Sequence, residues 1–214
     1  VHCPGRDREE VTVVDHVKLF RNRPELSFEF RIHEQVLPSI RRAGGEVAFT
    51  EIHVVHSGSD PSPEGRGRKV ERDLRILHAE LGERPDHPFA LFNLGMTYAD
   101  AERYPEAIEF LQRSIAVSRP DESHLRKAYA LLVSSLTQLE QTEQAAQICE
   151  RALRLFPQDK ELLFRQAMLW HQLNRHDEAV TAYRRVLEEP VDRHFASVDD
   201  GIAGYKARHN LAIL

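Results

Sequence analysis

The chain has 214 residues, of which 41% are hydrophobic and 29% charged, and its formal net charge at pH 7 is −5. This length and composition suit one domain of ordinary size or two small ones. The mild negative charge argues against nucleic acid as a partner, because that class of ligand usually requires a strongly basic face. No apolar run approaches the roughly 20 residues of a membrane span. Two cysteines make no disulfide framework, so a cytoplasmic location is the default expectation.

The first 56 residues alternate between strand-like stretches and turns. Val11–Phe20 and Phe28–Ile32 are rich in β-branched and aromatic residues, which favours strands. Glu34–Ala43 has the spacing of a short amphipathic helix that ends at two glycines. Glu46–His56 is predicted to be another strand. These elements cannot bury all their apolar faces, so we expect them to pack on the following helices or to be the end of a larger domain.

The next part of the chain is predicted to be a loop followed by a charged helix. Ser57–Gly65 is rich in serine, proline and glycine, which indicates a loop or linker. The helix is predicted over about Arg66–Gly82. One of its faces carries the apolar residues Val70, Leu74, Leu77 and Leu81.

A helix-turn-helix pattern begins near Pro88 and recurs. The small residues Ala107, Ala145 and Ala179 are spaced by 38 and then 34 residues. This spacing resembles the period of about 34 residues of the tetratricopeptide repeat (TPR), in which small residues allow two helices to touch. The large residues Tyr98, Leu136 and Trp170 recur with them. The pattern predicts repeats at 88–121, 126–159 and 160–193, with a partial repeat at 205–214.

A second resemblance concerns the N-terminal part. Val17-Lys-Leu-Phe-Arg-Asn22 and Phe28-x-Phe-Arg-Ile-His-Glu34 resemble the closing part of the catalytic domain of bacterial family 2 glycosyltransferases. His56, in Val-Val-His-Ser-Gly, and Arg68-Lys69-x-x-Arg72-Asp73 look like the next part of that pattern. A subgroup of these enzymes carries a TPR tail directly afterwards. The resemblance implies a terminal α+β part of a glycosyltransferase-like domain at 1–60, a linker helix at 61–87 and a TPR domain at 88–214.

The predicted fold is therefore mainly α: a TPR-type superhelix of antiparallel helix pairs, preceded by a small α+β segment with strands and one short helix. In the family, an Asp-x-Asp motif holds a divalent cation against the diphosphate of a nucleotide sugar. No Asp-x-Asp occurs here. We therefore expect no cofactor for this chain itself, and we expect a divalent cation and a nucleotide sugar in a full-length parent. The chain by itself is not expected to be an enzyme.

Three residues are candidates for chemistry through this resemblance. His33 and Glu34 are adjacent at a predicted strand end and point to opposite sides, so one of them is expected to face the acceptor site: Glu34 as a base for the acceptor nucleophile, or His33 as a polar or metal contact. The structural alternative is that Glu34 favours the positive end of the following helix while His33 caps a strand. His56, at a predicted strand end before a glycine-containing loop, is a candidate imidazole ligand for the cation, with an ordinary structural histidine as the alternative.

The first helix of each TPR pair lines a concave groove. Counting groove positions along the predicted first helices gives these peptide-binding candidates: Phe89, Phe92, Met96, Lys127, Ala130, Ser134, Phe164, Met168 and His171. Five of them are large and apolar, which suits an apolar peptide stretch. Alternatively, the lead-in helix or the catalytic segment folds back and covers them. On the groove interpretation, Phe92→Ala with Phe164→Ala weakens peptide capture and leaves the helical fold intact.

The leading functional hypothesis is an interaction scaffold that recognises a protein or peptide, as a partner or as the acceptor of a sugar-transferring parent. The competing hypothesis is a stand-alone TPR adaptor whose N-terminal strands cap the superhelix. A third hypothesis is self-association through the open fourth repeat, which would add subunits end to end. We expect neither nucleic acid nor a membrane span.

Overall fold

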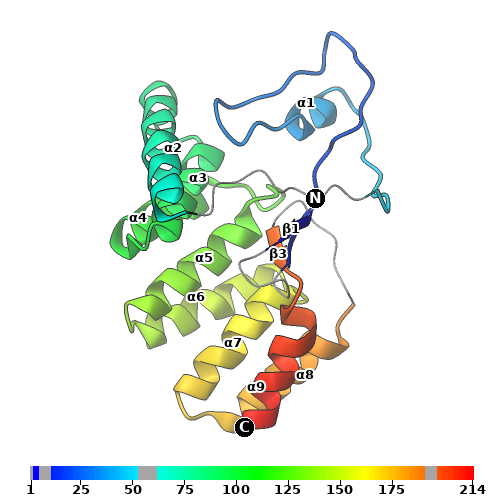
Figure 1. Ribbon diagram of the computed structural model, residues 1–214. Helices are drawn as coiled ribbons and strands as arrows, with labels where there is room; N and C mark the ends of the chain where they lie inside the picture. Colours follow the sequence, from blue (N-terminus) through cyan, green and yellow to red (C-terminus); the bar gives the residue numbers. More distant parts are fainter. Residues whose placement is uncertain (1, 5–10, 53–61, 191–196) are drawn as a thin grey trace.

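The computed structural model describes residues 2–4, 11–52, 62–190 and 197–214, and most of these residues lie in helices (Figure 1). No helix among them is long and apolar enough to cross a membrane. The elements in chain order are β1 (His2–Pro4), β2 (Val11–Val14), α1 (Leu37–Arg42), α2 (Pro63–Glu83), α3 (Pro88–Asp100), α4 (Tyr104–Val117), α5 (Leu125–Gln138), α6 (Thr142–Leu155), α7 (Lys160–Gln172), α8 (His176–Glu188), β3 (Ser197–Asp199), the π-helix η1 (Ile202–Lys206) and α9 (Ala207–Ile213).

Helices α3 to α8 form three antiparallel pairs that stack side by side (Figure 1). The turn inside each pair has the same conformation, with a left-handed residue directly after the C-cap of the first helix. These residues are Glu102, Glu140 and Asn174, with φ of 59°, 59° and 58°. In each turn the next amide donates back to the large residue of the repeat pattern: Arg103 to Tyr98 at 2.9 Å, Gln141 to Leu136 at 3.0 Å and Arg175 to Trp170 at 2.8 Å. The predicted helix pairs are therefore confirmed.

The closest approach of α3 and α4 occurs at Gly95. A methyl group built there would lie 2.6 Å from Leu111 Cγ and 3.1 Å from the Leu111 backbone nitrogen. Leu111 is fully buried, so neither its side chain nor its backbone has free space to move into. Packing of α3 on α4 therefore requires glycine at this position.

We expect Gly95→Ala to lower the free energy of unfolding by about 1 to 2 kcal/mol, because the clash with Leu111 exceeds the gain in helix propensity of about 1 kcal/mol. The matched control is Gly67→Ala in α2, where a methyl group would meet nothing within 4 Å. This control should raise stability by about 0.5 to 1 kcal/mol. Urea unfolding followed by circular dichroism measures both. Equal effects of the same sign would contradict the packing argument.

Helix α2 is longer than predicted, because it begins at Pro63 inside the expected loop. Ser62 is its N-cap, and the side-chain oxygen accepts a hydrogen bond from the Gly65 amide at 3.0 Å. Proline at the first helical position has the φ that a helix needs and lacks an amide hydrogen that would go unpaired. Leu77 of α2 is buried in the same core cluster as residues of α3 and α4.

The prediction that the N-terminal 60 residues form an α+β segment of several strands and one helix is wrong for the described residues. Only Val11–Val14 of the predicted strand Val11–Phe20 is a strand. Phe28–Ile32 contains a single isolated bridge, between Glu29 and Gln35, and residues 46–52 form no strand. The helix predicted over Glu34–Ala43 is reduced to α1, because both backbone groups of Gln35 are bonded to Glu29, at 2.9 and 3.1 Å. Alternating apolar residues favour a strand, but they do not supply its hydrogen-bonding partner.

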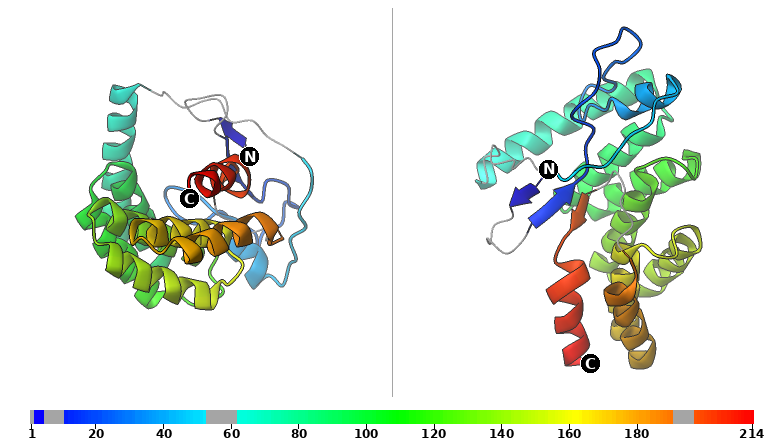
Figure 2. Two further views of the ribbon diagram at one scale, coloured as in Figure 1. Left: turned by 90° about the horizontal axis from the view of Figure 1, so that it is seen from below. Right: turned by 90° about the vertical axis from the view of Figure 1, so that its right-hand side faces the viewer.

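The described strands instead form a small antiparallel sheet of order β1-β2-β3. Val13 pairs with His2 on one side and with Val198 on the other. The sheet therefore joins the N-terminal part of the chain to the segment just before α9. Figure 2 shows the helix pairs curving around α9 and this sheet. Asn210 of α9 donates to the Tyr183 hydroxyl of α8 at 3.0 Å, which fixes α9 against the last complete pair.

Candidate functional site

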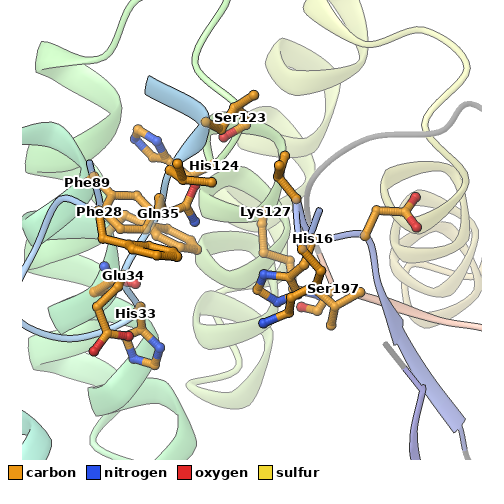
Figure 3. Close-up of a pocket in the computed structure, with 18 of the residues that line it drawn as sticks. His16, Phe28, His33, Glu34, Gln35, Phe89, Ser123, His124, Lys127 and Ser197 are labelled. Atoms are coloured by element: carbon orange, nitrogen blue, oxygen red, sulfur yellow. The ribbon is translucent and has the colours of Figure 1, made fainter. Parts of the chain in front are cut away.

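A cavity of about 390 Å³ lies between the N-terminal segment and the first helices of the superhelix (Figure 3). Its walls come from parts that are distant in sequence: residues from 14–20, 28–37, 89–96 and 123–127, together with Ser197. Figure 3 shows Phe28, Phe89, His33 and Glu34 towards one side of the view and Lys127, His16 and Ser197 towards the other. Aromatic and polar side chains therefore line the cavity together.

The N-terminal segment covers the beginning of the predicted groove. The Phe30 ring lies 4.5 Å from the Phe89 ring and 5.1 Å from the His87 ring, measured between centroids. Phe89 and Phe92 are only 9% and 6% exposed. Of the two interpretations that the sequence left open for these residues, the structure shows a segment folded back over them.

This docked segment has an unusual backbone. Phe30 and His33 have φ of 73° and 56°, in the left-handed region that bulky side chains rarely adopt. Tertiary contacts must compensate for this strain. They include the Phe30 ring contacts, an ion pair of Arg31 with the buried Glu80 at 3.4 Å, and packing of Ile32 against the core of the first helices.

We expect Phe30→Ala to weaken the docking of the N-terminal segment by about 1.4 kcal/mol, since a half-buried aromatic ring contributes roughly half of its full burial energy. Hydrogen exchange at the Glu29 and Gln35 amides, which bond across the docked turn, should accelerate by about tenfold. Phe28→Ala is the control, because Phe28 is 61% exposed. Equal acceleration in both variants would mean that Phe30 does not anchor the segment.

The two candidate catalytic residues, His33 and Glu34, both line the cavity. They do not lie at a strand end, and Glu34 is outside the first turn of α1, so the helix-dipole explanation for Glu34 is not supported. Burial lowers the pKa of His33, and the positive charge of Lys69 acts in the same direction. The imidazole is therefore neutral at pH 7, and the pair presents one neutral ring and one carboxyl group.

The candidate metal ligand His56 lies outside the described residues. Within the described ranges, no group of three or more histidine, cysteine, aspartate or glutamate side chains is placed to hold a metal ion. These residues therefore do not make a cation site by themselves, and we assign no chemical step to a cation.

Lys127 lines the cavity, but its positive charge is paired with a carboxylate. Its ammonium group donates to both oxygens of Glu161 at 2.9 Å, and Arg165 donates to the same carboxylate at 2.8 Å. Burial raises the pKa of Glu161, but the charges of Lys127 and Arg165 outweigh it and hold that pKa below its usual value. This network connects α5 to α7 along the concave face.

Four of the nine groove candidates line this cavity. Phe89, Phe92, Met96 and Lys127 line the cavity, and the other five do not. Ala130 is buried in the core, and Ser134 is half-buried. Phe164 packs edge-to-face on Tyr183 at 5.6 Å, and His171 lies 5.6 Å from His176, both between ring centroids. Met168 remains 39% exposed.

Several cavity residues carried no signal in the sequence. Phe28 belongs to a motif stretch but is not among the candidate site residues, His16 lies directly before the other motif, and Ser197 lies far from every motif. His124 is almost fully buried, which lowers its pKa to about 4, with a smaller contribution from His87. Its Nε2 lies 3.0 Å from Ser118 Oγ, so it supports the start of α5.

Comparisons with known proteins confirm the repeats. Two family models, each described as tetratricopeptide repeat, match residues 86–158 and residues 130–191. A MamA crystal structure is 21% identical with a TM-score of 0.51, over 63% of this chain and 74% of that one. A MamA RS-1 ArsTM double mutant gives 21% and 0.51, over 62% and 76%. The chain therefore contains tetratricopeptide repeats, a class of fold that mediates protein interactions.

Two curated proteins that are similar to part of the chain are glycosyltransferases. They are the SPbeta prophage-derived glycosyltransferase SunS of Bacillus subtilis (strain 168) and glycosyltransferase SunS of Bacillus phage SPbeta. Each is 25% identical over 126 residues, which is 58% of this chain and 30% of the relative. The match thus spans less than a third of the length of these relatives.

Proposed function

We propose that this chain is the acceptor-recognising region of a family 2 glycosyltransferase that modifies a protein or peptide. One observation carries the proposal. His33 and Glu34, from the glycosyltransferase-like segment, line the same cavity of about 390 Å³ as Phe89 and Phe92 from the repeats. The similarity to part of two SunS glycosyltransferases supports it.

In this proposal the aromatic and the polar side chains of the cavity have different tasks. The exposed ring of Phe28 binds an apolar side chain of the acceptor, next to the largely buried Phe89 and Phe92, which line the same cavity. The carboxylate of Glu34 accepts the proton of the acceptor nucleophile, and the neutral His33 ring hydrogen-bonds next to it. Divalent cation and nucleotide sugar belong to the longer parent, where His56 is a candidate ligand of the cation.

The repeats would accelerate the reaction by proximity. A peptide held in the cavity makes the second encounter, between its nucleophile and the carboxylate, intramolecular. A short flexible connection gives effective concentrations in the millimolar range. Recognition of the acceptor and catalysis are then coupled through one docked segment, residues 28–37.

The test uses the full-length parent with Mn²⁺, UDP-glucose or UDP-N-acetylglucosamine, and a library of peptides read by mass spectrometry. We expect sugar transfer to a peptide, and we expect Glu34→Gln to lower kcat by roughly 10² to 10⁴ with little change in KM for the peptide. The control is Glu109→Gln, since the Glu109 side chain is 61% exposed and lines neither the 390 Å³ cavity nor the larger one beside it. Unchanged kcat in the Glu34 variant would remove Glu34 as the base, and no nucleotide-sugar binding by the parent would remove the enzyme class.

A stand-alone adaptor is the second candidate, and one observation favours it. Phe30 and Ile32 pack against the core cluster of the first helices, so the N-terminal segment also acts as a cap of the superhelix. An adaptor should bind peptide and show no affinity for nucleotide sugars in any longer form. Self-association through α9 is a separate proposal, and sedimentation velocity at increasing concentration tests it.

A further inference from the structure

Strand β2 ends at Val14, although the strand-like sequence pattern continues to Phe20. The described pairing reaches Val13 on the β1 side and Val14 on the β3 side. Across the described parts of the chain, the backbone of residues 15–22 makes no hydrogen bond. The apolar and aromatic residues continue nevertheless, and Leu19 and Phe20 are 78% and 39% exposed. Unpaired backbone that continues a strand is a ready template for another extended chain.

This stretch separates two cavities. Besides the cavity of about 390 Å³, a second cavity of about 540 Å³ lies between residues from 15–26 and 40–52. Both cavities are lined by Asp15, His16, Val17, Lys18 and Phe20. A strand added along residues 15–20 would send successive side chains in opposite directions. Each cavity is then positioned to receive every second side chain.

The charges of the walls indicate what kind of peptide fits. Two acidic and two basic side chains line the smaller cavity: Asp15, Glu34, Lys18 and Lys127. Three of each line the larger one: Asp15, Glu25, Glu46, Lys18, Arg21 and Arg23. Neither cavity therefore favours a charged ligand. The apolar residues Phe20, Phe28 and Phe89 in one cavity, with Leu26, Val47 and Phe49 in the other, favour apolar side chains.

We propose that residues 15–20 bind an uncharged peptide as an added β-strand, through backbone hydrogen bonds that continue the β1-β2-β3 sheet, with alternate apolar side chains in the two cavities. This inference rests on the proposed function, because it names how a peptide acceptor is held. Backbone pairing supplies affinity, and the two cavities supply side-chain selectivity. Such an acceptor is extended where it is modified, with its nucleophile beside Glu34.

The experiment uses the chain as it is and a fluorescent, end-capped heptapeptide that alternates Phe or Val with Ser or Thr. Fluorescence anisotropy should show saturable binding, and hydrogen exchange of amides 15–20 should slow on binding. The same peptide with N-methyl groups on alternate amides keeps every side chain but loses donors on one edge. It should bind about tenfold more weakly. Equal affinity of the methylated and the unmethylated peptide, or no binding of the unmethylated peptide, would overturn the inference.

Two proline variants of the protein sharpen the test. Val17→Pro and Lys18→Pro each remove one amide hydrogen, and successive amides of an extended strand point to opposite edges. Relative to Val17→Ala and Lys18→Ala, one proline variant should lose about tenfold in peptide affinity while the other loses little. Both lie outside the described helices, so an unchanged circular dichroism spectrum checks the fold. Equal losses in both would overturn the strand geometry, whereas the Glu34→Gln kinetics test the enzyme proposal separately.

Discussion

Glu161→Gln is expected to lower the free energy of unfolding by about 3 kcal/mol at pH 7. The carboxylate, whose side chain is 11% exposed, accepts hydrogen bonds from Lys127 and Arg165. The variant leaves two poorly exposed cations beside an amide, and removal of one member of a buried ion pair costs about 3 to 5 kcal/mol. Urea unfolding at pH 7 measures the difference.

The pH dependence identifies the cause. The folded-state pKa of Glu161 is lowered, so its stabilising contribution is complete above the unfolded value of about 4.3 and is lost as the pH falls towards the folded value. The difference between wild type and variant should therefore be constant above about pH 5 and shrink below it. Glu178→Gln, in an exposed pair with Arg175, is the control and should show no measurable change. A difference that does not vary with pH would attribute the loss to packing rather than charge.

Phe92→Ala is expected to be similarly damaging, at about 3 kcal/mol. The ring is 6% exposed and lies 5.3 Å from the His124 ring and 6.0 Å from the Phe89 ring, between centroids. Its removal leaves a cavity in the core of the first two repeats. The sequence-based expectation that Phe92→Ala with Phe164→Ala leaves the fold intact is therefore replaced by an expected loss of stability.

Met168→Ala is the matched control for Phe92, because Met168 occupies a predicted groove position but is 39% exposed. It should change the free energy of unfolding by less than about 1 kcal/mol. Thermal unfolding and urea unfolding of both variants measure the contrast. If Phe92→Ala is as mild as Met168→Ala, Phe92 is a surface residue of the groove and the first interpretation of the sequence returns.

The repeats were predictable because their structure is local. The turn at Glu102, the packing of Gly95 on Leu111 and the position of Tyr98 all involve residues close in sequence. A period of small and large residues encodes such contacts directly. The start of α2 was missed only because Ser62 and Pro63 fit both a loop and a helix N-terminus.

The N-terminal segment was harder to predict because its structure depends on distant partners. Phe28–Ile32 has strand-forming residues, yet Phe30 adopts a left-handed conformation to reach Phe89. No local pattern predicts that contact. The position of Ser197 in the cavity likewise depends on the pairing of β3 with β2, which joins residues from opposite ends of the chain. The sequence therefore indicated candidate site residues such as His33 and Glu34, but it did not indicate which other residues lie next to them.

The pairing of Val13 with Val198 has a consequence for the order of folding. Helix pairs close short loops and form early, whereas a contact between the two ends of the chain must wait until the intervening repeats have stacked. During synthesis, Val198 leaves the ribosome long after the first repeats. The side of the cavity that Ser197 lines is therefore completed last, after the superhelix has set the distance that the sheet must bridge.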